Sequence, residues 1–153
     1  SALLINLGGG VISDMGGFAA STYKRGIDFI NIPTTLLSQV DASVGGKLGI
    51  DFSHFKNHIG LFNEPEMIFI DSIFFDTLPK REIRSGFAEV IKHGLIADKT
   101  YWESIADLDI NTKYWNEIVE QSVEIKKKVV KEDPFEAGLR KILNLVMALS
   151  PLT

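Results

Sequence analysis

The sequence predicts a chain of two parts, an α/β part with a parallel sheet over residues 1–78 and an all-helical part over residues 79–153. Three short apolar runs, each followed by small or polar residues, indicate buried strands. A helical stretch separates the first two runs, and this strand–helix–strand order is typical of a parallel sheet. After Leu78 the pattern changes, because a proline near a first helical turn marks a helix start.

Each element follows from local signals. In the first part, a crossover helix is predicted over residues 11–23, and Arg25 and Gly26 mark its end. The glycine-rich stretch 38–63 has few helix signals and predicts a loop or a short hairpin. The strands are predicted at residues 2–7, 29–32 and 67–70, and the helices of the second part at residues 80–97, 99–105, 111–131 and 135–147.

Composition narrows the possible functions. The 153 residues carry a formal net charge of −4, which argues against binding to nucleic acid. Without cysteine, disulfides, iron–sulfur clusters and thiolate zinc sites are excluded, so a transition metal would need Asp, Glu or the three histidines. His54, His58 and His93 lack metal-like spacing and are interpreted as structural. No apolar run approaches a membrane span and no leader is visible, so we expect a cytoplasmic protein without a membrane partner.

Both termini are unusual for a natural domain. The chain enters a strand pattern without an initiator Met or a polar lead-in, and its end is apolar without a capping signal. Natural domains usually begin with a few loosely held polar residues. We therefore expect this chain to be an excised or incomplete piece of a longer protein.

Gly8, Gly9 and Gly10 follow the first strand and precede the first helix. Bare backbone N–H groups at such a place can cradle a phosphate, although a tight strand-to-helix turn needs the same residues. Asp14, one turn later, could face a cofactor or could compensate the helix dipole.

Gly45-Gly46-Lys47 is not a P-loop, because Asp41 stands where that motif needs Gly and Leu48 where it needs Ser or Thr. Charged and amide side chains crowd this loop. They are either solvated or form a site for an anionic, hydroxyl-rich small molecule. These side chains belong to Asp41, Lys47, Lys56 and Asn57.

Two helices carry further candidates. Glu89, Lys92 and His93 stand at i, i+3 and i+4, which fits an ordinary surface Glu–Lys pair. The small residues nearby would also allow the close approach of another element or of a ligand. Lys126 falls near the centre of the apolar stripe of its helix, whereas Lys128 points away. A lysine on a buried face needs an anion or a route to water, and a ligand phosphate and a structural Glu are both open partners.

In their order and spacing, these residues resemble the 3-dehydroquinate synthase family from residue 8 to residue 144. The first part matches at residues 8–14, 25–26, 32–37, 40–47 and 56–57, and the second part at residues 88–92, Lys126, residues 136–140 and Asn144. The resemblance implies a two-domain fold whose α/β domain binds NAD. It also implies a shikimate-pathway lyase that uses NAD and a divalent metal, zinc or cobalt, to turn a sugar acid phosphate into 3-dehydroquinate.

The resemblance also implies roles for individual residues. NAD contacts are implied at Gly9, Gly10, Val11, Asp14, Thr34, Thr35 and Lys56 and from Phe74 to Thr77. Substrate contacts are implied at Asp41, Lys47, Asn57, Lys92, Lys126, Arg140 and Asn144, with Lys92 and Lys126 also serving catalysis. Glu136 is implied as a proton acceptor and Glu89 as one of three metal ligands. Arg25 is implied to reach a neighbouring subunit's substrate, so a homodimer is expected.

The chain departs from the family pattern after Asn144. Family members place there a Gly-His segment, whose His is a second metal ligand, and then a further His. Here Leu-Val-Met at residues 145–147 and Pro151 stand in those places, and Leu48 stands where Thr is usual. We therefore expect one of three metal ligands, part of a cofactor site, and no activity from this chain alone. The alternatives are another sugar phosphate cyclase and a non-catalytic nucleotide-binding module.

Overall fold

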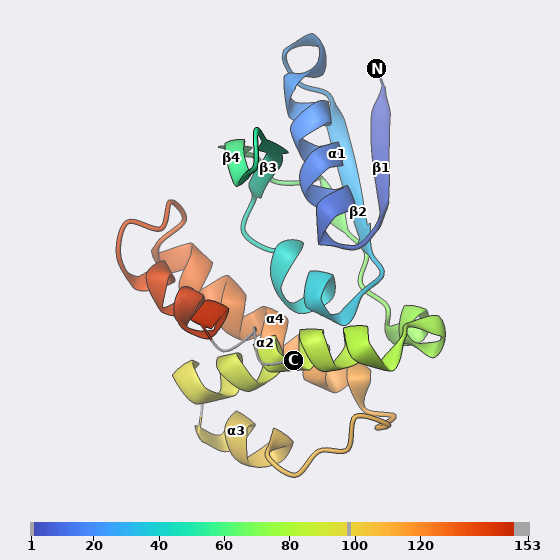
Figure 1. Cartoon of the computed structure of the whole chain (residues 1–153), viewed down its shortest axis with the longest axis vertical. Coiled ribbons are helices and arrows are strands. Elements are labelled where there is room, and N and C mark those ends of the chain that lie inside the picture. Colours follow the sequence, from blue (N-terminus) through green and yellow to red (C-terminus); the bar gives the residue numbers. More distant parts are fainter. Residues whose placement is uncertain (1, 98, 149–153) are drawn as a thin grey trace.

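A small parallel sheet organises the first part of the chain in the computed structural model, which describes residues 2–97 and 99–148. Its elements are β1 Leu3–Gly8, α1 Gly10–Thr22, β2 Asp28–Pro33 and β5 Met67–Ile68. The strand order is β1–β2–β5 with both pairings parallel, and α1 connects β1 to β2. Figure 1 shows α1 lying against one face of this sheet. The predicted parallel α/β architecture is confirmed.

The sheet face under α1 contains a buried polar pair. Asn6 of β1 and Asn31 of β2 are neighbours in register, and Asn6 Nδ2 donates to Asn31 Oδ1 at 2.9 Å. Gly16 of α1 lies over this pair, because a Cβ atom there would come within 1.8 Å of Asn6 Oδ1. Glycine thus allows the helix to approach closely enough to bury both amides, and their hydrogen bond offsets the cost of burial.

The opposite face of the sheet is apolar and open in the described part of the chain. The side chains of Leu3, Ile5 and Leu7 alternate with the buried ones and are each more than half exposed, as is Met67 of β5. The prediction of fully buried strands is therefore wrong for β1, because among the described residues only one face of the strand is covered. Parallel sheets are normally covered on both faces, so this face is the part of the fold that the described elements leave unpacked.

The stretch 38–63 forms a short helical turn and a hairpin. The turn η2 is π-helical over Ser38–Ala42, and the antiparallel strands are β3 Lys47–Phe52 and β4 Phe55–Phe62. The predicted hairpin is therefore present. Its pairing shifts register between Ile50 and Phe52, and Asn57 has a left-handed backbone with φ of 51°. A bulge of this kind redirects neighbouring side chains, which matters for the pocket described below.

The second part is helical, as predicted, with two differences in its bounds. The 3₁₀ turn η3 Ser72–Thr77 precedes it, and its elements are the helices α2 Lys80–Ala97, α3 Lys99–Ile105 and α4 Trp115–Glu132 and the 3₁₀ segment η4 Leu139–Ala148. The helix predicted at residues 135–147 is thus a 3₁₀ segment that begins later, because the Asp133 carboxylate accepts backbone N–H groups of residues 137, 138 and 140 and holds a turn. Helix α4 begins later than residue 111, because the side chains of Asp109 and Thr112 accept the backbone N–H groups of Asn111 and Tyr114 and hold a turn. Residues 149–153 of the predicted second part lie outside the described residues. No described helix combines the length and apolar character that crossing a membrane requires.

The main apolar core joins the two parts of the chain. Leu36, Val40 and Val44, from the segment around η2, pack with Val90 of α2 and Val123 of α4 in one buried cluster. In Figure 1 the η2 turn lies between the sheet above and the helices below. The division near Leu78 stays a prediction, and the position of η2 against α4 is what builds the site.

Candidate functional site

Lys126 and Asp41 form a charged pair where η2 meets α4. The Lys126 side chain is 6% exposed, and its Nζ lies 2.5 Å from Asp41 Oδ1 and also donates to the Asp41 backbone carbonyl. Burial lowers the pKa of Lys126 and the Asp41 carboxylate opposes this. Burial alone would raise the pKa of Asp41, but Lys126 outweighs it and the pKa lies below its ordinary value. Of the two predicted alternatives for Lys126, an anion or a route to water, the structure shows an anion, and this partner within the chain is Asp41 instead of a glutamate.

Glu89 and Lys92 on α2 form a second buried pair beside the first. Their side chains are 14% and 4% exposed and make an ion pair, so the interpretation as an ordinary surface pair is wrong. The reason is that α2 is packed on several sides: Gly86 lets it approach the segment that leads into η2, and α4 and η4 pack against it as well. Burial raises the pKa of Glu89 although Lys92 opposes it.

His93 follows Lys92 on α2 and is completely buried. Within the described part of the chain neither ring nitrogen has a hydrogen-bond partner. Burial and the neighbouring Lys92 lower the pKa of His93 to about 4, so the ring is neutral at pH 7. The structural role assigned to it stays a prediction.

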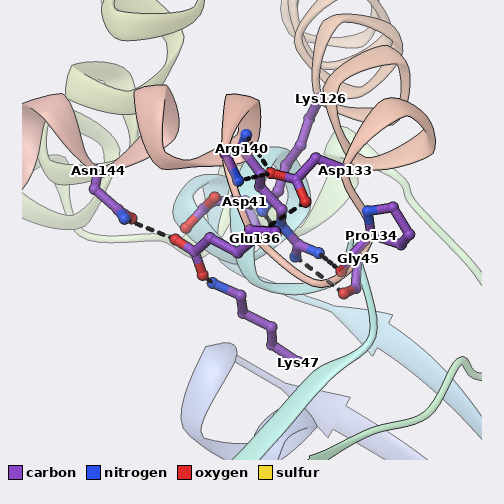
Figure 2. A network of polar contacts seen from close by, with 11 residues as sticks. Asp41, Gly45, Lys47, Lys126, Asp133, Pro134, Glu136, Arg140 and Asn144 are labelled. Atoms are coloured by element: carbon purple, nitrogen blue, oxygen red, sulfur yellow. Dashed lines mark hydrogen bonds and ion pairs between the residues drawn. The ribbon is translucent and has the colours of Figure 1, made fainter.

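A second cluster connects the loop after η2 with the segment between α4 and η4. Glu136 makes an ion pair with Lys47 and accepts a hydrogen bond from Asn144 Nδ2 at 2.7 Å. Arg140 is buried, and its guanidinium donates to the carbonyls of Pro134 at 2.7 Å and Gly45 at 2.9 Å. Figure 2 shows Glu136 between Lys47 and Asn144, with Lys126 and Asp41 behind it. Lys47 and Asn144 hold the pKa of Glu136 below its ordinary value, so this carboxylate is charged at neutral pH.

The glycines that follow β1 form the predicted turn into α1. Gly9 is the residue that precedes α1 and has no side-chain cap, and the carbonyl of Gly8 accepts the N–H of Thr34 at 2.9 Å. A Cβ atom on Gly10 would lie 3.1 Å from Ala42 Cβ, so η2 packs against this turn. The turn therefore lies at the carboxyl ends of β1 and β2 and at the start of a helix, the place where parallel sheets bind phosphates.

Asp14 lies beyond the first turn of α1, so its interpretation as compensation of the helix dipole is wrong. Burial and the nearby Asp41 raise the pKa of Asp14 to about 6, while Lys126 and Lys56 oppose them. The Asp14 carboxylate therefore interacts electrostatically with the buried pair of Asp41 and Lys126.

A pocket of about 450 Å³ between α1 and the hairpin gathers three predicted site residues, Asp14, Lys47 and Asn57. His58 lines the same pocket, although in a regular strand it would face away from Asn57. The register shift and the left-handed Asn57 explain how two consecutive residues reach one side. Sequence analysis missed His58 as a pocket residue, and periodicity could not have found it because the bulge breaks the period.

Arg25 lies apart from this cluster, exposed just beyond the end of α1, opposite to the end that carries Gly9. Lys56 is exposed on β4, near enough to Asp14 to act on its pKa. Val11 is 74% exposed near the start of α1. Thr35 hydrogen-bonds to Ser38 at the entry to η2, beside Thr34. Phe74 and Thr77 lie on η3.

A metal site is not assembled in the described residues, where no three of His, Cys, Asp and Glu are grouped to hold an ion. Glu89 is the predicted ligand, and it is paired with Lys92 instead of with further ligands. The predicted departures at residues 145–147 concern side chains outside the described ones, as does Pro151. The residues present therefore do not by themselves fit a zinc centre.

Asp133 is a second residue that sequence analysis missed. Its carboxylate accepts the backbone N–H groups of Ala137, Gly138 and Arg140 at 2.7 to 3.0 Å. The only sequence signal was an Asp at the end of a predicted helix, which is too common to single out.

The comparisons with known proteins agree with one another. Residues 1–85 match the family described as 3-dehydroquinate synthase N-terminal, and residues 86–146 the one described as 3-dehydroquinate synthase C-terminal. Similar curated proteins include the 3-dehydroquinate synthases of Parabacteroides distasonis, 54% identical over 147 residues, and of a Sulfurovum species, 53% identical over 144 residues. Each match covers 94% of this chain and 42% or 41% of the relative. The chain thus spans about two fifths of the length of these relatives.

Solved structures of related cyclases share the fold. A 2-epi-5-epi-valiolone synthase from Streptomyces hygroscopicus, with NAD+ and Zn2+ bound, matches with a TM-score of 0.83 and 28% identity over 99% of this chain and 47% of its own. A 2-deoxy-scyllo-inosose synthase complexed with carbaglucose-6-phosphate, NAD+ and Co2+ matches with a TM-score of 0.84 and 28% identity over 92% of this chain and 40% of its own. Sequence family and fold therefore point to the same group of enzymes.

Proposed function

The chain belongs to the 3-dehydroquinate synthase family, and from that premise we propose that its protein converts 3-deoxy-D-arabino-heptulosonate 7-phosphate to 3-dehydroquinate and phosphate. The observation that carries this proposal is the charged cluster at the junction of η2, α4 and η4. There a buried lysine, a buried arginine and a charged glutamate meet beside one pocket. A substrate with a phosphate, a carboxylate and several hydroxyls matches this combination of cations and hydrogen-bonding groups.

We propose specific roles for the residues of the cluster. Lys126 and Arg140, both buried, would bind the anionic groups of the substrate, which must compete with Asp41 for Lys126. Lys92 would leave Glu89 for a substrate hydroxyl in the same way. Glu136 is ionised at neutral pH and can accept a proton from the substrate, while Lys47 and Asn144 hold its side chain in place. Asn57, which lines the pocket with Asp14, would bind substrate hydroxyls.

NAD is the proposed cofactor. The turn at Gly9 and Gly10, together with Thr34 and Thr35 at the end of β2, supports a site for its phosphates, with Asp14 facing the same region. When bound, NAD would supply hydride transfer, oxidising a substrate hydroxyl so that the neighbouring C–H becomes acidic and phosphate can leave by elimination. Zinc or cobalt is the proposed metal, and Glu89 is its one predicted ligand among the described residues.

Further proposals concern the whole protein. We propose a lyase that works in the cytoplasm as a homodimer, in which Arg25 reaches the substrate phosphate of the neighbouring subunit. The exposure of Arg25 and its place at the far end of α1 are compatible with a role outside its own cluster.

A second candidate is another sugar phosphate cyclase, because the similar solved structures are valiolone and inosose synthases. The set of Lys126, Arg140 and Asn144 favours a substrate that carries a carboxylate as well as a phosphate over sugar phosphates without a carboxylate. A non-catalytic nucleotide-binding module is a third candidate, supported by the incomplete metal site in the described residues. Binding of NAD without binding of any sugar phosphate would favour that candidate.

Calorimetric titration with NAD and with the heptulosonate phosphate tests the proposal on this chain. We expect Lys126→Met to weaken binding of the sugar acid phosphate by roughly tenfold or more, because a charge-assisted contact is lost. Lys128→Met is the matched control, since Lys128 is exposed on the same helix and should leave the affinity unchanged. Equal affinity of both variants, or tighter binding by the unmodified chain of a sugar phosphate without a carboxylate, would contradict the proposal.

A further inference from the structure

The segment that links α4 to η4, together with the first residues of η4, brings two of the proposed site residues, Glu136 and Arg140, to the cluster. It folds around one carboxylate, that of Asp133 at the end of α4. Asp133 Oδ1 accepts the N–H of Ala137 at 2.8 Å, and Oδ2 accepts those of Gly138 at 2.7 Å and Arg140 at 3.0 Å. Three backbone donors thus converge on a single side chain, which Figure 2 shows beside Arg140.

The backbone of this segment takes a shape that needs such support. Glu136 has a φ of 58°, in the left-handed region that residues with a Cβ atom seldom adopt. The conformation is set locally, because the Glu136 N–H bonds to the Asp133 carbonyl at 3.3 Å while the next N–H groups turn toward the Asp133 carboxylate. These bonds hold the pKa of Asp133 below its ordinary value, so the carboxylate is charged when it accepts them.

This turn sets the directions of the Glu136 and Arg140 side chains. The left-handed residue directs Glu136 toward Lys47 and Asn144, and the next turn places Arg140 against Pro134 and Gly45. The three hydrogen bonds to Asp133 come from the backbone, so its effect on the site passes through the chain itself.

We propose that Asp133 is a positioning residue, whose carboxylate fixes the backbone of residues 133–140 so that Glu136 and Arg140 face the substrate site. The identity of the ligand rests on the proposed function, whereas the positioning of Glu136 does not. The two can therefore be tested separately on the same variants.

The experiment compares Asp133→Asn with the unmodified chain. Asparagine has the size of aspartate but a single acceptor oxygen, so it cannot satisfy donors that now approach from both sides of the carboxylate. Asp109→Asn is the matched control, because the Asp109 carboxylate also accepts a backbone N–H group, that of Asn111, in an exposed turn far along the chain from the cluster.

The first measurement is the pKa of the Glu136 carboxyl, obtained by ¹³C NMR titration. In Asp133→Asn it should rise toward the ordinary value of a glutamate, because Lys47 and Asn144 lose their fixed partner, and in Asp109→Asn it should not change. The second measurement is the dissociation constant for the heptulosonate phosphate. It should rise roughly 10- to 100-fold in Asp133→Asn only, as expected when binding groups are misplaced by about an ångström.

The outcomes separate the two proposals. An unchanged Glu136 pKa in a folded Asp133→Asn variant would overturn the positioning role. If the unmodified chain fails to bind the sugar acid phosphate while the Glu136 pKa responds as expected, the proposed function fails and the positioning role stands. Should Asp133→Asn not fold, amide hydrogen exchange in the unmodified chain decides, since unprotected N–H groups at Ala137, Gly138 and Arg140 would overturn the inference.

Discussion

Lys126 shows why single residues at this site are sensitive to change. Its ammonium group is buried, whereas the Asp41 side chain is 36% exposed and can reach water without its partner. Removing the Asp41 carboxylate therefore leaves the Lys126 ammonium buried without its partner, while removing the ammonium leaves a carboxylate that solvent can hydrate. The two halves of the pair should not have equal effects.

This asymmetry predicts the result of a double-mutant cycle. Asp41→Ala should reduce the free energy of unfolding by about 2 kcal/mol, a value lowered from that of a fully buried pair because Asp41 is partly exposed. Lys126→Met should cost less, and adding it to Asp41→Ala should recover part of the loss. Urea denaturation measures all three, with Lys128→Met as an exposed control that should stay within about 0.5 kcal/mol. A loss of unfolding free energy within about 0.5 kcal/mol in Asp41→Ala would contradict the prediction.

Asp14 and His93 predict opposite dependences of stability on pH. The folded chain keeps the Asp14 proton up to about pH 6, whereas the unfolded chain releases it near 3.8, so Asp14 makes stability fall as pH rises through that window. His93 is protonated near pH 6.5 when unfolded but only near pH 4 when folded, so it makes stability fall as pH drops. Each contributes at most about 3 kcal/mol, and in the unmodified chain the two largely cancel.

Variants separate these contributions. Asp14→Asn should lose stability more steeply than the unmodified chain on acidification from pH 6.5 to 4, and His93→Leu should gain stability over the same range. Denaturation midpoints at several pH values provide the measurement. Parallel curves for the three proteins would show that neither group titrates as the structure implies.

The individual residues also mark the limit of what the sequence could predict. The position of Lys126 in an apolar stripe predicted that it needs an anion, because helical periodicity alone places it on the buried face. Asp41 as its partner could not be predicted, since 85 positions separate the two and only the packing of η2 against α4 brings them together. The same holds for Lys47 and Glu136.

At the scale of elements, α2 and the segment that leads into η2 pack with almost no space between them. A Cβ atom on Gly86 would lie 2.5 Å from the backbone nitrogen of Leu37, so glycine is required at this position of the helix. Helix α4 and the η4 segment also pack against α2, and within this packing the ion pair of Glu89 and Lys92 is buried.

Gly86→Ala should destabilise the chain by about 1–2 kcal/mol, because the clash with a backbone atom outweighs the roughly 1 kcal/mol by which alanine favours a helix. Gly138→Ala is the control, since nothing lies within 4 Å of the added methyl group. Thermal or urea unfolding distinguishes the two. A stabilised Gly86→Ala variant would mean that α2 does not pack as closely as described.

The bounds of α2 and α3 match the prediction. The predicted bounds were wrong where side chains bond to the backbone. Asp109 and Thr112 delay the start of α4, and Asp133 accepts the Arg140 N–H, which a helix from residue 135 would have used in its own hydrogen bonds. These bonds depend on loop geometry, which local propensity does not encode.

For the whole molecule, the apolar core joins the two parts of the chain, and the charged cluster lies at the same junction. Family membership predicted which residues contribute, and the structure explains how they meet: Asp14, Asp41 and Lys47 come from the α/β part, whereas Lys126, Glu136 and Arg140 come from the helical part. The open sheet face at Leu3, Ile5 and Leu7 was not predicted, because an apolar strand pattern does not tell whether both faces are covered.

Release of phosphate from 3-deoxy-D-arabino-heptulosonate 7-phosphate, with NAD and zinc or cobalt present, tests the proposed function most directly. The assay would use this chain alone and a chimera in which residues 1–144 replace the matching segment of the relative that is 54% identical. We predict no release from the chain alone and NAD-dependent release of phosphate with formation of 3-dehydroquinate by the chimera. A folded chimera that binds NAD but forms no 3-dehydroquinate would contradict the proposed function.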